Sequence, residues 1–134
     1  MSDNTTNRLH DTFFYGLYMV PEILEKCGVD ARNPRKAYVE NFELCIGNKA
    51  TLLRSPGKKA FGIIYSLTHD EINQLYWGAG LTEYRSEALI ATREDGNTLA
   101  VLCCNLLTPP ADGESNPEYA EKLEAAMQNL GLPF

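Results

Sequence analysis

Positive charge is scarce in this sequence. Twelve lysines and arginines stand against eighteen aspartates and glutamates, which gives a net charge of −6. A surface that binds nucleic acid needs clustered Lys and Arg to neutralise phosphates. The nearest cluster here is Arg54 with Lys58 and Lys59, and we interpret it as a solvated turn. The charge balance therefore argues against a nucleic-acid partner.

Long hydrophobic runs are missing as well. The longest are about half of the ~20 residues that a membrane-spanning helix requires, so we expect no membrane association. Residues 1–10 are polar and lack the apolar segment of a secretory signal. Together these features predict a cytoplasmic protein.

Patterns that bind metals, phosphates or nucleotides are also absent. The four cysteines show no Cys-x-x-Cys spacing, and His10 and His69 stand apart from them. We find no Gly-x-Ser-x-Gly motif, phosphate-binding loop or Gly-x-Gly-x-x-Gly. The adjacent Cys103 and Cys104 are expected to act as small buried side chains on opposite faces of a strand. We predict no metal site and no cofactor.

A chain of 134 residues has the size of one domain. We expect residues 1–11 to be a flexible lead-in and residues 12–134 to form that domain. Runs of β-branched, aromatic or alternating apolar residues predict strands at residues 12–15, 36–53, 60–67, 84–92 and 98–106. Gly and Pro signals predict a turn at residues 55–58 and a hairpin at residues 94–97.

Spacing and capping signals predict three helices. Residues 19–27 repeat apolar side chains on one face. Thr68 and Glu71 form the capping box of a second helix, which should end at Trp77. Asn116 and Gly131 flank the third. Because strands and helices do not alternate regularly, the pattern predicts an α+β fold with a curled, mostly antiparallel sheet.

The turn after the first predicted strand is the best candidate for a site. Here the chain passes from strand to helix, and main-chain N–H groups at such a junction lack partners and attract carboxylates or developing oxyanions. Gly16 lets the backbone come close to a ligand. A tight turn that holds no ligand explains the same residues.

Several segments, taken in order, resemble the γ-glutamylcyclotransferase-like family. Residues 13–19 (Phe-Phe-Tyr-Gly-Leu-Tyr-Met) are similar to the opening element of that family, and residues 61–67 (Phe-Gly-Ile-Ile-Tyr-Ser-Leu) to its central strand. Tyr84, the hairpin and the closing segments 116–119 and 131–133 match in order as well. The resemblance covers about residues 13–133. It implies a barrel-like sheet with about three flanking helices.

The resemblance also implies a ligand and a place for it. In that family the first loop, which corresponds to residues 15–19 here, holds a γ-glutamyl group through backbone N–H contacts. The expected partner is therefore a small molecule with a carboxylate or γ-glutamyl group, in a polar cleft between residues 15–19 and residues 77–84, with Trp77 as one wall. The implied substrate-binding residues are Tyr15, Gly16, Leu17, Tyr18, Met19 and Tyr84.

The family's catalytic residue has no counterpart in this chain. A glutamate in a Leu-Asp-x-x-Glu-Gly motif takes the proton of the substrate amine, whereas the matching residues 75–80 place Ala79 at that position. The Ser or Thr of the first loop is replaced by Leu17. Glu83 is the candidate for a relocated acid/base, and a surface ion pair is its alternative role. Two functions stay open: a 5-oxoproline-forming enzyme, or a catalytically silent ligand-binding or protein-interaction module.

Overall fold

The computed structural model describes residues 5–134, so the first four residues of the expected lead-in lie outside it. The described chain folds into five strands, three α-helices and one short 3-10 helix. In chain order these elements are β1 (His10–Phe14), η1 (Leu17–Met19), α1 (Pro21–Lys26), β2 (Arg35–Ile46), β3 (Ala50–Leu67), α2 (His69–Tyr76), β4 (Tyr84–Arg93), β5 (Thr98–Leu106) and α3 (Pro117–Leu130).

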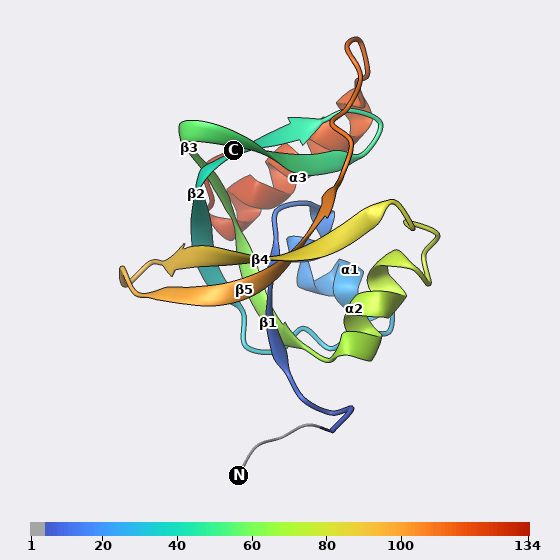
Figure 1. Ribbon diagram of the computed structural model, residues 1–134, viewed down its shortest axis with the longest axis vertical. Coiled ribbons are helices and arrows are strands. Elements are labelled where there is room, and N and C mark those ends of the chain that lie inside the picture. The colour runs from blue at the N-terminus through green and yellow to red at the C-terminus, as the bar shows by residue number, and fades with distance from the viewer. Residues whose placement is uncertain (1–4) are drawn as a thin grey trace.

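The strands close into a barrel in the order β1-β3-β2-β4-β5 (Figure 1). Neighbouring strands are antiparallel, except that β1 meets β5 in parallel at Thr12 and Leu102, which closes the barrel. The predicted α+β fold with a curled, mostly antiparallel, barrel-like sheet is confirmed. The hairpin at residues 94–97 is confirmed too, with Gly96 at a φ of 85°.

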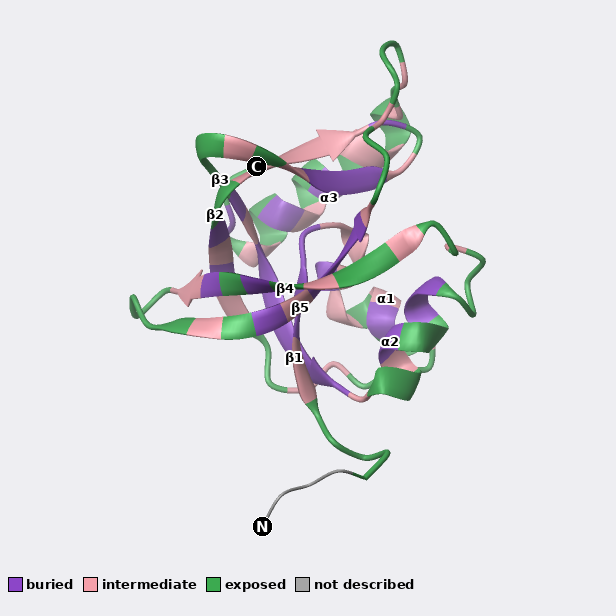
Figure 2. Cartoon of the chain, viewed as in Figure 1, coloured by how far each residue is buried: buried purple, intermediate pink, exposed green. Residues whose placement is uncertain are grey.

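Two hydrophobic clusters lie on opposite faces of the strands. One is built almost wholly from strand residues, many of them small or β-branched, such as Ala37, Val39 and Val101, as a narrow five-stranded barrel requires. The other brings in side chains of all three α-helices. Cys103 belongs to the first cluster and Cys104 to the second, as their adjacent positions predicted. Figure 2 shows the buried residues along the strands and the exposed ones on the outer helix faces.

The helices lie outside the barrel (Figure 1). The predicted capping box of α2 is present, since the Thr68 side chain accepts from the Glu71 N–H and the Glu71 side chain accepts from the Thr68 N–H. Asn116 caps α3, and Gly131 ends it in the left-handed region. The Gln74 side chain donates a hydrogen bond to the carbonyl of Cys27, which ties α2 to α1. No helix within residues 5–134 is long and apolar enough to cross a membrane.

Strand β3 requires a glycine beside the end of β1. A Cβ at position 62 would lie 2.1 Å from the carbonyl oxygen of Phe14 and 2.9 Å from the Phe13 ring. That distance is far inside van der Waals contact, so any side chain at this position would push β1 away from β3. Gly62 therefore fixes the start of the first loop.

The bounds of several elements differ from those predicted, and the first strand and first helix are two of them. β1 begins at His10 rather than residue 12, because Asp11 pairs with Arg35 at 2.8 Å and holds this end of the strand on the sheet. The predicted helix at residues 19–27 is divided into η1 and α1. Val20 is extended, with φ −81° and ψ 119°, since a residue before proline avoids the helical region.

The turn predicted at residues 55–58 is wrong. β3 continues through these residues, and the pairing with β2 shifts register between Glu40 and Phe42. Gly57 and Asn41 both have positive φ, and the Gly57 N–H donates to the Asn41 side chain. The Pro-Gly signal marks a bulge in this case. The actual turn between β2 and β3 falls at residues 47–49, so the single strand predicted at residues 36–53 is wrong as well. This turn brings Lys49 beside the first loop.

Candidate functional site

A cavity of about 390 Å³ opens beside the first loop. Residues 14–18 form one wall, and the β2–β3 turn and the segment after α2 form the others. We call it the first-loop cavity. Of the residues predicted to bind substrate, five line it and one does not: Met19 is fully buried in the core beneath it. The five are Tyr15, Gly16, Leu17, Tyr18 and Tyr84.

The chemistry of this cavity differs from the polar cleft that we expected. Its walls are mainly apolar, and five of the thirteen residues that line it are tyrosines. Tyr15 donates its hydroxyl to the carbonyl of Cys104 at 2.7 Å, Tyr18 to Leu75, and Tyr84 to Ala50. These bonds hold the rings in place as walls, since each buried hydroxyl needs an acceptor.

The tyrosine hydroxyls of the cavity stay protonated at neutral pH. Burial raises the pKa of Tyr18 to about 12, and it raises the pKa of Tyr15, Tyr76 and Tyr84 as well. Desolvation disfavours the phenolate, so these groups are poor bases. They offer shape and hydrogen bonds to a ligand.

Tyr119 of α3 contributes a polar group that sequence analysis missed. Its hydroxyl accepts a hydrogen bond from the Leu17 N–H at 3.2 Å. A Cβ at Gly16 would lie 2.5 Å from the same oxygen, so the glycine makes room for the hydroxyl. Asn116 caps the helix by accepting from the Tyr119 N–H, which positions the ring. The signal was present, because Tyr119 is the only aromatic residue of the predicted closing helix.

Two backbone N–H groups of the first loop remain available. The N–H of Met19 bonds to the Gly16 carbonyl and that of Leu17 to Tyr119. Those of Gly16 and Tyr18 make no hydrogen bond with any residue in the described range 5–134. The phenolic proton of Tyr119 likewise has no acceptor within that range. These three donors lie on residues that line the first-loop cavity.

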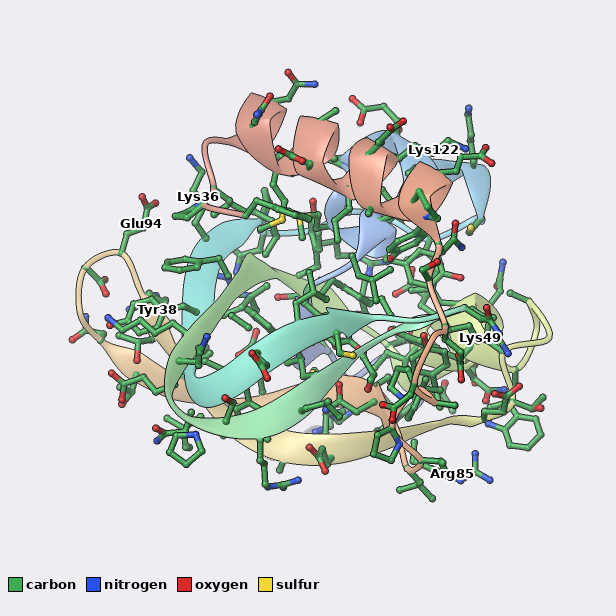
Figure 3. The ribbon with its side chains drawn as sticks, turned by 90° about the horizontal axis from the view of Figure 1, so that it is seen from above. Lys36, Tyr38, Lys49, Arg85, Glu94 and Lys122 are labelled. Atoms are coloured by element: carbon green, nitrogen blue, oxygen red, sulfur yellow. The ribbon has the colours of Figure 1, made fainter. Side chains whose placement is uncertain are left out.

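Lys49 is the charged residue of the lining. It comes from the β2–β3 turn, on the side of the molecule that carries the segment after α2 (Figure 3). Its Nζ lies 2.6 Å from Oε1 of Glu83. Sequence analysis missed Lys49 because the Pro-Gly signal placed the turn elsewhere.

The two positions considered for the acid/base both lie outside the lining. Ala79 is exposed in the turn after α2. Glu83 is also exposed, with 64% of its side-chain surface accessible, and forms the surface ion pair with Lys49. Trp77, expected as a wall, is 54% exposed and does not line this cavity. Within residues 5–134, no carboxylate lines the cavity.

Glu114 is the acidic residue that packs behind the β2–β3 turn. Its two carboxylate oxygens accept from the N–H groups of Ala111 and Asn48, at 2.6 and 3.1 Å. These bonds, that from Ala111 first, lower the pKa of Glu114. The residue therefore anchors the loop before α3 against the turn. No group of three or more His, Cys, Asp or Glu residues suited to a metal ion occurs in the described part of the chain.

Comparison with solved structures identifies the fold. A γ-glutamyl cyclotransferase superimposes with a TM-score of 0.75 at 18% identity, over 94% of this chain and 82% of its own. An AIG2-like protein from Mus musculus gives 0.60 at 20% identity, over 84% and 83% of the two chains. A protein from Arabidopsis thaliana gives 0.68 at 21% identity, over 96% and 91%. No protein-family model and no curated protein matches the sequence.

These likenesses extend over nearly the whole chain. The protein has the γ-glutamylcyclotransferase-like fold, as the order of its sequence segments indicated. Because only about one residue in five is identical, the likeness extends to the architecture alone.

Proposed function

We propose that the chain binds a small amino-acid-like molecule, with a γ-glutamyl or similar carboxylate group, in the first-loop cavity. One observation carries the proposal: the cavity combines aromatic walls with hydrogen-bond donors and a single cation. Lys49, the phenol of Tyr119 and the free N–H groups of Gly16 and Tyr18 supply the donors. Pockets of this kind, mostly apolar with a few polar groups, are typical of small-ligand sites.

A carboxylate suits these groups because all of them donate. Charge-assisted hydrogen bonds to an anion are about twice as strong as those between neutral groups. The ligand would take the place of Glu83 beside Lys49. That exchange costs little, since an ion pair this exposed is worth ~0–1 kcal/mol. Glu83 then acts as a competitor for Lys49 at the entrance.

We expect the chain to bind such a ligand and to convert it to 5-oxoproline slowly or not at all. Closing 5-oxoproline from a γ-glutamyl amide requires a group that takes the proton of the amine, and such assistance is worth ~10²–10⁴ in rate. The described lining holds no carboxylate, and its tyrosines keep their protons. Purified protein should release little or no 5-oxoproline from γ-glutamyl dipeptides or glutathione.

The test compares two charge-neutralising variants. Calorimetric titration with 5-oxoproline, a γ-glutamyl dipeptide and the dipeptide's amidated form measures whether the carboxylate is recognised. Lys49→Gln should weaken binding of the acids at least tenfold and leave the amide unchanged. Glu83→Gln, the matched control on the other side of the ion pair, should bind as well as the wild type or a few times tighter.

Three results would contradict the proposal that the chain binds this ligand without converting it. Equal affinity of Lys49→Gln for the acids, or no binding of any probe by the wild type, would remove the proposed site. Rapid 5-oxoproline release that Glu83→Gln abolishes would assign Glu83 as the acid/base and make the chain an enzyme. The wild type and both variants should be compared at equal folded fraction, checked by circular dichroism.

A further inference from the structure

A second cavity, of about 290 Å³, lies between α2 and the strands β4 and β5. His69 and Asn73 of α2 and Trp77, the residue that follows the helix, stand at four-residue intervals and form one ridge. Ser86 of β4 faces them, and it pairs in the sheet with Cys104 of β5. We call this the α2 groove. Its lining differs from that of the first-loop cavity, apart from Tyr84, which touches both.

The polar side chains of the α2 groove are open to hydrogen bonding. Within residues 5–134, no hydrogen bond or ion pair involves the side chains of His69, Asp70, Asn73 or Ser86. Elsewhere on the same helix, Glu71 bonds to Arg32 and Gln74 bonds to the Cys27 carbonyl. The face of α2 toward α1 is therefore bonded, while the groove face presents several open donors and acceptors.

Two aromatic features bound the groove. The ring of His10 packs on that of His69 with 3.9 Å between centroids, which supports the His69 side chain from behind. At the other end, the Trp77 indole is 54% exposed. The guanidinium of Arg85, at the periphery in Figure 3, lies 5.7 Å from its ring centroid. An exposed indole beside open polar groups is a common anchor for a ligand.

The charge pattern narrows the class of ligand. Asp70 disfavours an anion, and the Arg85 cation beside Trp77 disfavours an organic cation on that ring. The amide of Asn73 and the hydroxyl of Ser86 are uncharged and combine donors with acceptors, as hydroxyls of a ligand also do. Asp70 accepts, whereas Asn73 and Ser86 both donate and accept. A neutral ring with several hydroxyls and one apolar face matches this set.

We propose that the α2 groove binds a saccharide of one or two rings, with a C–H face of the sugar on Trp77 and its hydroxyls on Asp70, Asn73 and Ser86. This site is independent of the first-loop cavity, because none of these four residues lines that cavity. The volume of about 290 Å³ lies just below the roughly 300–1,000 Å³ of ordinary binding sites, so the groove suits a small ligand that is partly enclosed.

The chain carries its own reporter for the test. Trp77 is the only tryptophan, so indole fluorescence arises from a residue of this groove. The probes are glucose, galactose, mannose and N-acetylglucosamine and their disaccharides, titrated to tens of millimolar. We expect a saturable change in Trp77 emission with at least one of them. Asp70→Asn with Asn73→Ala should weaken that sugar at least tenfold, and Asp112→Asn, an exposed loop control, should not.

A second measurement keeps the result independent of fluorescence. In ¹H–¹⁵N spectra, the same sugar should shift the amide signals of residues 69–77 and 84–86. Trp77→Phe should keep these shifts and Trp77→Ala should lose them. Absence of any saturable change across the panel overturns the proposal, as does undiminished binding by the double variant. Tetramethylammonium binding to Trp77 in place of the sugars would assign the groove to cations instead.

Discussion

The contact between Gly16 and Tyr119 gives a prediction that can be worked through in numbers. Replacing Gly16 by Ala places a Cβ 2.5 Å from the Tyr119 hydroxyl oxygen, while the next ring atom, Cζ, is 3.8 Å away. The backbone at Gly16 is extended, with φ −110° and ψ −160°, so alanine causes no dihedral strain. The whole cost therefore comes from moving the Tyr119 hydroxyl.

We expect Gly16→Ala to lower the free energy of unfolding by about 1–3 kcal/mol, the range for overpacking. Tyr119→Phe removes the clashing oxygen and also the hydrogen bond from the Leu17 N–H. The loss of that bond should lower the free energy of unfolding by about 0.5–1.5 kcal/mol. When Tyr119→Phe is already present, adding Gly16→Ala should cost less than about 0.5 kcal/mol, since Cζ at 3.8 Å is an ordinary contact.

Urea unfolding of the four proteins, followed by far-ultraviolet circular dichroism, measures this cycle. The two substitutions should be coupled by about 1–2 kcal/mol. If their effects add within about 0.5 kcal/mol, the hydroxyl does not lie over Gly16 and the geometry of the first-loop cavity is wrong. Gly80→Ala, with no atom within 4 Å but a positive φ, measures for comparison the cost of dihedral strain without a clash.

Three further outcomes are expected. Gly62→Ala should destabilise the protein by about 3 kcal/mol or more, because its Cβ would meet a carbonyl oxygen at 2.1 Å; a loss below about 1 kcal/mol in urea unfolding would contradict this. Burial alone would raise the pKa of the Glu71 carboxyl, but hydrogen bonds from Arg32 and two backbone N–H groups lower this pKa below 4.5. The stabilisation that Glu71 provides is therefore present above that pH and is lost as the pH falls through the lowered pKa. The stability difference between wild type and Glu71→Gln, about 1–2 kcal/mol at pH 7, should accordingly shrink below pH 4.5. Burial raises the pKa of the Cys104 thiol to about 11 and also raises that of Cys103. Ellman's reagent should therefore modify the half-buried Cys27 and Cys45 in the native protein and the other two only after unfolding.

Sequence patterns located most elements because the determining signals are local. The capping box at Thr68 and Glu71, the Asn116 cap and the Asp-Gly hairpin each depend on residues within one turn of chain. The bulge at Gly57 was misassigned because its partner, Asn41, lies sixteen residues away in the neighbouring strand. Pro-Gly marks a change of backbone direction, and only the pairing of β2 with β3 decides between a bulge and a turn.

The residues of the first-loop cavity also fall into those predictable from a local pattern and those placed only by tertiary contacts. Residues 15–18 were found because they form one continuous segment of a recognisable pattern. Lys49 and Tyr119 reach the same cavity from elements far along the chain, so their roles depend on the barrel being closed. Tyr119, for example, is 102 residues from the Leu17 N–H that it accepts from. The contact of Glu83 with Lys49 is also tertiary, since the two residues are 34 positions apart in the sequence.

The parallel contact of β1 with β5 has a consequence for synthesis on the ribosome. The apolar side chains of Phe13 and Phe14 leave the ribosome early, yet the barrel closes only when residues 98–106 have followed. At ~5–20 residues per second, that interval is roughly 5–20 seconds. Even after β3 has paired with one edge of β1, the other edge, which will meet β5, stays open to association with other chains during this interval. Folding yield in cells should therefore depend on translation speed and on chaperones that cover this strand.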